Sequence, residues 1–391
     1  MTIRKNICVV TGSRAEYGLL FPLLQVMQAT KHFEIRLVVT GTHLSKKHGL
    51  TVESIRSDGF IVAGEVDLLL EDDSTTGICK AMGVGLIGFA NAYKELKPNL
   101  LVLLGDRYEL LSAAAAALIS KIPIAHIHGG EVTEGAYDDG IRHSITKMSY
   151  LHFTSTERYR LRVVQMGEHP DRTFNVGALG VDNISRLRIL SEDEVERFLG
   201  CSLAKKNILV TFHPETLAEN EEEGLPQLLE VLSTRRDIRV IFTGVNADTR
   251  AHKIDHLIRE FVSNNGERTS FHSSLGYKKY LSTMRYMSAV VGNSSSGLIE
   301  APSMNVATIN IGQRQKGRVR ADSVLDCEAN VPSISAAFDK LEDPNFIAKV
   351  KQTVNPHGKS GASSRILKEL IRTQLDWQPK KTFYDLSKSL N

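Results

Sequence analysis

The sequence has few cysteines, and their spacing suits neither a metal site nor a disulfide framework. The four, Cys8, Cys79, Cys201 and Cys327, lie far apart and form no CxxC pair. We therefore expect reduced thiols in a cytoplasmic protein. The histidines lack the HExxH spacing of a zinc-binding helix, so we expect no metal.

A large net charge and long apolar runs are also missing. The chain has 48 Lys and Arg against 45 Asp and Glu, a formal net charge of +3, without long blocks of one charge. This composition gives no support to nucleic-acid binding or to a basic membrane-binding surface. No run approaches the roughly 18 apolar residues that a membrane span requires. The apolar N-terminal run is expected to be a buried first strand, not a signal peptide.

Short apolar runs do occur, and they alternate with segments of helical length. Apolar strands separated by helices predict parallel sheets that are covered on both faces. A chain of 391 residues with 42% apolar residues is long enough for two to three domains. The expected strands lie within residues 6–12, 35–41, 99–106, 122–130, 150–156, 173–177, 207–214, 238–244, 288–296 and 306–312.

Two features separate the two strand series. One is the glycine-rich stretch "GALGVDNI", and the other is a self-contained helix with a capping box from Ser191 to Glu194. We predict an α/β protein with two Rossmann-like domains facing a cleft, an N-terminal one of residues 1–176 and a C-terminal one of residues 177–364. In such sheets, ligands bind beyond the carboxyl ends of the strands.

Polar side chains gather after the strands of both halves. The first half has "TGSRAEYG", "TGTH" and "LGDRYE", and the second has "TFHPET", "FTG", "GNSSSG" and "IGQRQKGR". A single Asp or His at such a place is more often a helix cap. Their occurrence at most strand ends instead indicates one ligand cleft. The first strand is not followed by GxGxxG and no Walker pattern is present, which disfavours dinucleotide redox chemistry and P-loop hydrolysis. We expect a phosphorylated small molecule and acid–base chemistry without a cofactor.

The turn "GNSSSG", which contains Ser294, Ser295 and Ser296, enters an expected helix. Its hydroxyls and backbone N–H groups either bind phosphate or only cap that helix. After the next strand, four basic residues alternate and would share one side of an extended segment: Arg314, Lys316, Arg318 and Arg320. This segment is either a solvated loop or a diphosphate site, with Arg314 as the best candidate contact.

The most concentrated group of ionisable residues lies in "AHIHGGEVTEGAYDDGIRHSI", residues 125–145. His128 and Glu131 follow a strand, with two glycines that let the backbone turn sharply. Crowded or desolvated carboxylates have raised pKa values and can exchange protons near neutral pH. The alternative is an internally paired junction between a loop and a helix.

The helix expected after this loop places Asp138 four residues before Arg142, and Asp139 four residues before His143. Residues four apart lie on one helix face. The helix would therefore present both carboxylates and both basic groups at its N-terminal end.

The chain contains, in this order, the motifs "TGSRAEYG", "VTGTHLS", "GDRYE", "HIHGGE", "DDGIRHSITK", "HPET", "GNSSSG" and "GQRQKGR". In order and spacing these motifs resemble those of the hydrolysing UDP-N-acetylglucosamine 2-epimerases, which make N-acetylmannosamine for sialic acid synthesis. The resemblance runs over nearly the whole chain. It implies the two-domain GT-B fold, with final helices in residues 365–391 that cross back to the first domain. It also implies a UDP-sugar substrate and a homodimer or homotetramer.

The resemblance further implies a mechanism. UDP leaves C1 while a base removes the C2 proton, which gives a 2-acetamidoglucal. Water then adds, and C2 is reprotonated on the opposite face. Asp106 and Asp138 match the essential acids of the family. The positions expected to contact substrate are Arg14, His43, Arg107, Arg142, His143 and His213. Ser294, Ser295 and Arg314 match the diphosphate pocket, and Glu300 the residue that holds the ribose hydroxyls.

One position departs from the family pattern. Many relatives read "HIEGGE", with glutamate where this chain has His128. Either His128 itself or Glu131 would then take over that proton transfer. The alternatives for the whole chain are the same reaction on a 4-acetamido-6-deoxy UDP-sugar, a non-hydrolysing epimerase, a glycosyltransferase of the same fold, and a UDP-sugar binding module.

Overall fold

The computed structural model describes residues 4–46, 49–69, 72, 74–215, 224–244, 251–373 and 380–386. The chain divides into two compact units. The first consists of Met1–Glu131, Asp138–Asn183 and Gly358–Asn391, and the second of Val132–Tyr137 and Ile184–His357. The change from the first unit to the second thus follows residue 183, where the sequence analysis places it after residue 176. The short segment 132–137, which lies inside the predicted N-terminal domain, belongs to the second unit.

A seven-stranded sheet forms the centre of the first unit, in the order β3-β2-β1-β4-β5-β6-β7. Every neighbouring pair of its strands is parallel, as the apolar runs predict. Its strands are β1 (Lys5–Thr11), β2 (Phe33–Thr40), β3 (Val62–Val66), β4 (Leu100–Leu104), β5 (Ile124–Ile127), β6 (Leu151–Thr154) and β7 (Thr173–Asn175).

Both faces of this sheet are covered, because successive side chains of a strand point to opposite faces. In β1, Ile7 and Val9 enter one apolar cluster, and Cys8 and Val10 enter another. The covering elements are α1 (Arg14–Gln28), η1 (Gly41–Leu44), α2 (Val52–Ser57), α3 (Thr75–Leu96), α4 (Tyr108–Ile119), α5 (Asp138–Met148), α6 (Glu157–Gln165), η3 (Pro170–Arg172) and α7 (Leu179–Arg186).

A six-stranded parallel sheet forms the centre of the second unit, in the order β10-β9-β8-β11-β12-β13. Its strands are β8 (Asn207–Thr211), β9 (Arg239–Thr243), β10 (Thr269–His272), β11 (Ala289–Gly292), β12 (Ala307–Ile311) and β13 (Val324–Cys327). All ten strands expected from the sequence are confirmed. Three further strands, β3, β10 and β13, were not expected, and each lies at a sheet edge.

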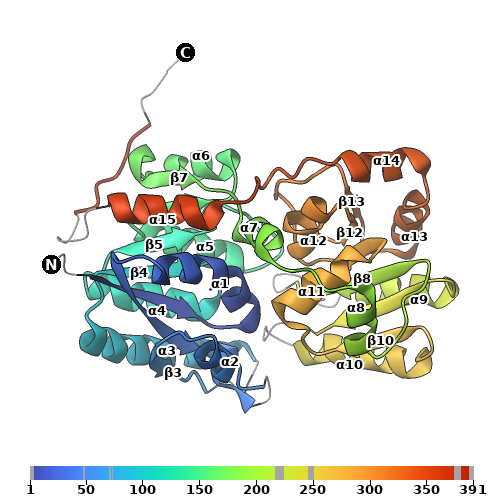
Figure 1. Ribbon diagram of the computed structural model, residues 1–391, viewed down its shortest axis with the longest axis horizontal. Helices are drawn as coiled ribbons and strands as arrows, with labels where there is room; N and C mark the ends of the chain where they lie inside the picture. The colour runs from blue at the N-terminus through green and yellow to red at the C-terminus, as the bar shows by residue number, and fades with distance from the viewer. Residues whose placement is uncertain are drawn as a thin grey trace. The chain divides into compact units, whose positions relative to one another are not determined.

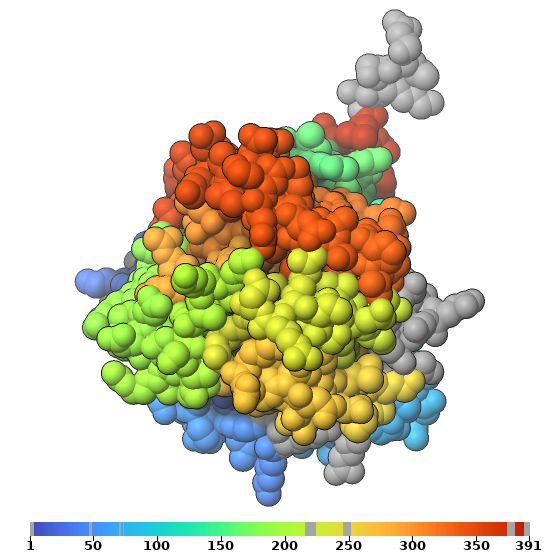
Figure 2. Space-filling view, turned by 90° about the vertical axis from the view of Figure 1, so that its right-hand side faces the viewer, coloured from blue at the N-terminus to red at the C-terminus, as the bar shows by residue number. Residues whose placement is uncertain are grey.

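Helices also cover both faces of the second sheet. Figure 2 views this unit from outside and shows the green to orange-red segments that form its surface. These helices are α8 (Glu192–Leu199), α9 (Leu225–Thr234), α10 (Ala251–Asn264), α11 (Gly276–Arg285), α12 (Ser296–Ile299), η4 (Ala301–Met304), α13 (Val331–Lys340) and α14 (Pro344–Gln352). Within the described ranges, no helix is both long enough and apolar enough to cross a membrane.

The chain returns to the first unit through α15 (Ala362–Arg372), which packs beside α1 (Figure 1). Ala362, Ile366 and Leu370 complete the apolar cluster on that face of the sheet. The expected helical segment 365–391 is only partly helical. The helix stops at Arg372, and residues 380–386 have no regular structure. Pro379, which cannot continue a helix, precedes this last stretch in the sequence.

Candidate active site

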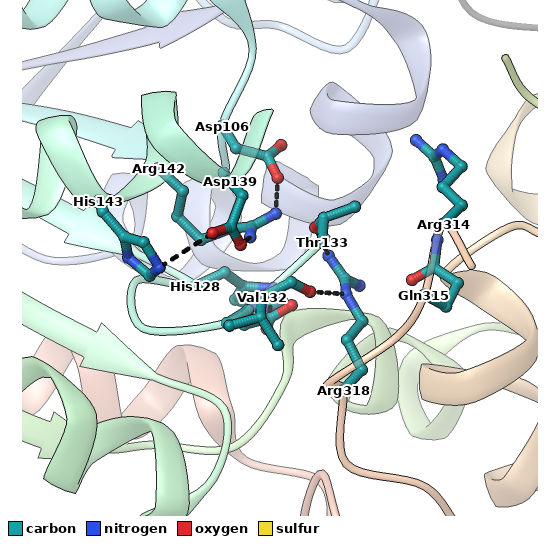
Figure 3. A network of polar contacts seen from close by, with 12 residues as sticks. Asp106, His128, Val132, Thr133, Asp139, Arg142, His143, Arg314, Gln315 and Arg318 are labelled. Atoms are coloured by element: carbon teal, nitrogen blue, oxygen red, sulfur yellow. Dashed lines mark hydrogen bonds and ion pairs between the residues drawn. The ribbon is translucent and has the colours of Figure 1, made fainter. Parts of the chain in front are cut away.

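Arg142 is the centre of the polar network in the first unit (Figure 3). It lies one turn into α5, its exposed fraction is 1%, and its guanidinium contacts Asp106 Oδ2. Asp106 follows β4, so α5 and the end of β4 meet at this ion pair. A buried arginine needs such partners, because an uncompensated charge away from water is costly. The carboxylate of Asp106 is partly exposed and remains accessible to a ligand.

The first turn of α5 supplies further carboxylates. Asp139 Oδ1 lies 3.5 Å from Arg142 Nη1, and Asp139 Oδ2 lies 3.5 Å from His143 Nε2. The two carboxylate oxygens of Asp139 thus face one basic group each. Asp138 is the first residue of the helix, where the positive end of the helix dipole favours a negative charge. The structure therefore confirms that Asp139 and His143 share a face of α5.

His126, which the sequence analysis did not single out, supports this helix from β5. Its Nε2 lies 2.7 Å from the Gly105 carbonyl oxygen, and its Nδ1 lies 3.1 Å from Thr146 Oγ1. Burial lowers the pKa of His126 to about 3, so the ring is neutral and links β4 to α5. A side chain at Gly129 would come within 2.9 Å of Thr146 Oγ1, which explains the glycine there.

His128 and Glu131 form a buried pair after β5. His128 Nδ1 lies 3.3 Å from Glu131 Oε1, and the Leu179 N–H donates to His128 Nε2 over 3.3 Å. Nε2 is therefore the acceptor nitrogen and Nδ1 carries the proton toward Glu131. The Ser155 hydroxyl also donates to Glu131 Oε1, over 2.8 Å. His128 has φ of +66°, an uncommon conformation for a side chain of this size.

The end of β1 and the start of α2 hold His43 in place. His43 Nε2 lies 3.1 Å from Thr11 Oγ1, and Nδ1 lies 2.7 Å from Thr51 Oγ1. Burial, reinforced by the charge of Arg14, lowers its pKa to about 4. His43 is therefore a neutral, fully buried ring held by two hydroxyls, and its predicted contact with substrate stays a prediction.

Two buried carboxyl groups near Arg107 were missed by the sequence analysis. Glu16 Oε2 accepts the Gly12 N–H over 3.0 Å, and a side chain at Gly12 would lie 2.5 Å from Glu109 Oε1. Glu109 Oε1 also lies 3.3 Å from Arg107 Nε. Burial raises the pKa of Glu16 well above its ordinary value, and the Glu109 charge adds to this. Both residues stand inside quoted motifs, "GSRAEYG" and "GDRYE", but sequence alone does not show that they share one glycine.

In the second unit, Asn293 connects the ends of β8 and β11. Its side-chain oxygen accepts the His213 N–H over 2.7 Å, and its amide donates to the His213 carbonyl over 2.8 Å. These two bonds fix the backbone at His213, a predicted substrate contact that is almost fully buried. Asn293 belongs to the predicted "GNSSSG" turn, although the sequence analysis emphasised its serines.

The serine turn differs from its predicted form. α12 begins at Ser296, spans only four residues, and continues into η4. A single turn provides little helix dipole, so a phosphate here would depend on the N–H groups and hydroxyls of the turn itself. Ser294 Oγ accepts the Ser296 N–H over 3.4 Å. Glu300, the predicted ribose ligand, is buried just after α12.

Arg314 lies in a turn after β12 that is fastened to the rest of the second unit. Glu215 Oε1 accepts the N–H groups of Gln313 and Arg314 over 3.1 and 3.2 Å. Arg314 Nη1 donates to the Asn293 carbonyl over 3.1 Å, and Gln315 Nε2 donates to the same oxygen over 2.8 Å. Arg314 is thereby held next to the serine turn, as the predicted diphosphate pocket requires.

The other basic residues of this region do not share one side with Arg314, because residues 314–317 form a turn and not an extended segment. Lys316 Nζ lies 3.7 Å from Glu134 Oε2. Arg320 Nε lies 2.6 Å from Asp326 Oδ2, and the two side chains form an ion pair. Arg318 donates to the carbonyl of Val132. The expected alternation of four basic groups along one surface is therefore wrong.

In the part of the chain that the structure describes, no three or more His, Cys, Asp or Glu side chains are grouped so that they could hold a metal ion.

Comparison with known proteins identifies the family. Residues 25–371 match the family model described as UDP-N-acetylglucosamine 2-epimerase. The hydrolysing GDP/UDP-N,N'-diacetylbacillosamine 2-epimerase of Campylobacter jejuni is 38% identical over 98% of this chain and 100% of its own length. Polysialic acid biosynthesis protein P7 of Escherichia coli is 41% identical over 98% of each chain.

A solved structure supports the fold. The UDP-N-acetylglucosamine 2-epimerase of Neisseria meningitidis bound to UDP-N-acetylglucosamine aligns with a TM-score of 0.79 at 17% identity, covering 94% of this chain and 100% of the other. The likeness shows a GT-B-like fold with two parallel-sheet units. The family model and the two relatives cover nearly the whole sequence, and the chain belongs to the UDP-N-acetylglucosamine 2-epimerase family.

Proposed function

We propose that the protein hydrolyses UDP-N-acetylglucosamine to UDP and N-acetylmannosamine through a 2-acetamidoglucal intermediate. In the first step a base takes the C2 proton, and the C1–O bond breaks with its electron pair leaving on UDP. In the second step, a water molecule gives one proton to a base while its oxygen bonds to C1, and an acid protonates C2 on the other face. The reaction needs at least two proton-transfer groups and no redox partner.

The network around Arg142 carries this proposal. It brings Asp106, from the end of β4, to the first turn of α5, which contributes Asp138 and Asp139. A guanidinium that contacts two carboxylates fixes the direction in which each of them points. We assign proton transfer to Asp106 and Asp138, and substrate binding to Arg142, Asp139 and His143.

The remaining proton-transfer group is Glu131. His128 receives the Leu179 N–H at Nε2 and turns Nδ1 toward Glu131, so its proton is directed to that carboxylate and away from Nε2. In the proposed mechanism Glu131 replaces the glutamate that many relatives carry at position 128, and His128 orients it. Arg14, His43, Arg107 and His213 complete the substrate contacts.

Nucleotide binding is assigned to the second unit. The turn that carries Arg314 and the turn that carries Ser294, Ser295 and Ser296 meet at the carbonyl of Asn293. Hydroxyl, backbone N–H and guanidinium donors in one place suit the oxygens of a diphosphate. Glu300 would accept from the ribose hydroxyls.

The second candidate substrate is UDP-N,N'-diacetylbacillosamine, the 4-acetamido-6-deoxy analogue. It is favoured by the Campylobacter jejuni relative and by a Legionella pneumophila relative that is 33% identical over 94% of this chain. The polysialic acid protein of Escherichia coli favours the first candidate. Both sugars lose UDP by the same chemistry and need the same acids.

The test is to incubate the purified protein with each UDP-sugar in D₂O and to identify the products by NMR. We expect UDP, free 2-epimeric sugar and one deuterium at C2, because the new C2 proton comes from solvent. The better substrate is the one with the higher kcat/KM. Accumulation of UDP-N-acetylmannosamine would identify a non-hydrolysing epimerase. A need for an acceptor sugar would identify a glycosyltransferase, and UDP binding without turnover a binding module.

A further inference from the structure

The short segment Val132–Tyr137 packs with the second unit, although the chain on either side of it belongs to the first. Arg318 makes the principal polar contacts that hold it. Its Nε donates to the Val132 carbonyl over 2.8 Å, and its Nη2 donates to Thr133 Oγ1 over 3.1 Å (Figure 3). The exposed fraction of Arg318 is 8% and that of Thr133 is 2%, so both bonds are shielded from water.

The segment also fits closely against the turn that carries Arg314. A side chain at Gly135 would come within 2.9 Å of the Arg314 Cα. A side chain at Gly317, which has φ of +81°, would come within 2.7 Å of Val132 Cγ2 and of Glu134 Oε1. Glycines on both sides let the two backbones approach, which leaves the segment little freedom to move relative to the turn.

Arg318 is therefore committed to peptide and hydroxyl oxygens. A planar guanidinium can donate to two neighbouring acceptors at once, and the ammonium of lysine cannot copy this fork. Removing it would leave the Val132 carbonyl in a shielded place without this donor, and the segment would lose its fixed path.

We infer that Arg318 is a positioning residue for catalysis, an inference that rests on the proposed function. It anchors the chain between Glu131 and Asp138, the two proton-transfer groups that directly flank the segment. Glu131 is joined by one peptide bond to the residue whose carbonyl Arg318 holds. Because a misplacement of about 1 Å can cost roughly 100-fold in rate, the anchor should act on turnover and not on nucleotide affinity.

The experiment compares Arg318→Ala, Arg318→Lys and Thr133→Val with the parent. We expect Arg318→Ala to lower kcat at least about 10-fold while the UDP dissociation constant, measured by calorimetry, stays within about threefold. Arg318→Lys should recover little of the loss. Thr133→Val removes one of the two bonds and should cause a smaller fall in kcat. Millimolar methylguanidinium should restore part of the kcat of Arg318→Ala and none of that of Asp138→Asn.

The matched control is Lys316→Ala, two residues earlier, whose exposed ammonium lies 3.7 Å from Glu134 and whose removal should leave kcat unchanged. Weakened UDP binding in Arg318→Ala with unchanged kcat would make Arg318 a phosphate ligand and overturn the inference. Unchanged kcat in Thr133→Val and Arg318→Lys would also overturn it, even if Arg318→Ala failed to fold. Failure of the proposed function would appear differently, as a parent protein without turnover.

Discussion

Glu16 and Glu109 place two carboxyl groups against one glycine, next to Arg107. The charged groups that face Glu16 are Glu109, which raises its pKa in addition to burial, and Arg107, which lowers it. Two neighbouring buried carboxylates are not both ionised at low cost. Glu16, whose pKa is raised, is the member that keeps its proton.

Glu16→Gln should change how stability depends on pH. Below the ordinary glutamic acid value of 4.5, Glu16 is protonated in both states. At higher pH the unfolded chain releases this proton while the folded protein keeps it, so the free energy of unfolding falls until the raised folded pKa is passed. Gln does not titrate. Urea midpoints measured from about pH 5 to pH 8 should therefore fall less in Glu16→Gln than in the parent.

Glu53→Gln, at an exposed position of α2, is the control and should follow the parent. Equal pH slopes for Glu16→Gln and the parent would show that Glu16 is ionised in the folded protein.

Arg314→Ala should weaken UDP binding. A charge-assisted hydrogen bond to phosphate contributes about 1.5–3 kcal/mol, so calorimetry should show a dissociation constant raised roughly 10-fold or more. Lys316→Ala removes a nearby charge whose side chain is 62% exposed and should leave the affinity unchanged. If the two variants bind equally well, the diphosphate lies elsewhere, with Arg14 as the next candidate.

At the scale of elements, α5 contributes most of the proposed chemistry, because its first turn supplies the acids and its second the arginine. His126 and Thr146 hold it to β4. A helix fixed in this way can present Asp138 with one orientation, which a mobile loop could not do.

Asp138→Asn keeps the shape and most hydrogen bonds of the side chain but removes its proton transfer. We expect kcat to fall by about 10²- to 10⁴-fold with UDP binding retained. The control is Asp193→Asn, in the first turn of α8, which tests the general effect of losing a first-turn carboxylate. Release of the 2-acetamidoglucal should also be measured in Glu131→Gln and His128→Gln. A variant that still eliminates UDP but does not hydrate the glucal would separate the first step from the second. A loss of only a few-fold in all three site variants would make this cluster a packed junction.

The sequence predicted the central strands and the edge strand β7, but it did not predict the other three edge strands. β3, β10 and β13 are edge strands with partly exposed side chains, so they lack the continuous apolar run that buried parallel strands show. Motifs likewise predicted which strand ends hold polar groups. They could not show the orientation of His128 or the partner of Arg318, because both depend on residues about 50 or more positions away.

The C-terminal residues 380–386 contribute to a cluster of charged groups around one buried carboxylate of the first unit. Glu168 Oε2 lies 2.7 Å from Lys381 Nζ and 2.9 Å from His152 Nε2, and Glu168 Oε1 lies 2.7 Å from Lys147 Nζ. Burial alone would raise the pKa of Glu168, but the hydrogen bonds from these three groups outweigh it and hold the pKa at about 2. Lys147 is in the last turn of α5, so the cluster ties residues 380–386 to this helix.

Lys381→Met should lower stability by removing one of three donors to a buried carboxylate, a loss of about 1.5–3 kcal/mol. Because the pKa of Glu168 is depressed, its stabilising contribution is present above the ordinary value of 4.5 and is lost as the pH falls toward about 2. The parent's advantage over Lys381→Met, measured by chemical denaturation, should shrink over that acid range. The neighbouring Lys380→Met, at an exposed position, should match the parent. Equal stability of both variants would show that the tail contact contributes nothing.

The first unit draws its core from both ends of the chain, and this has a consequence during synthesis. Ala362, Ile366 and Leu370 belong to the same apolar cluster as Ile7 and Val9. Until the ribosome has released residues beyond 370, the N-terminal sheet exposes the apolar surface that α15 will cover. Apart from residues 132–137, the second unit is continuous from 184 to 357 and can finish folding first. The part of the protein that begins translation is therefore the last to be completed, and its exposed surface is the one that needs protection from aggregation in the meantime.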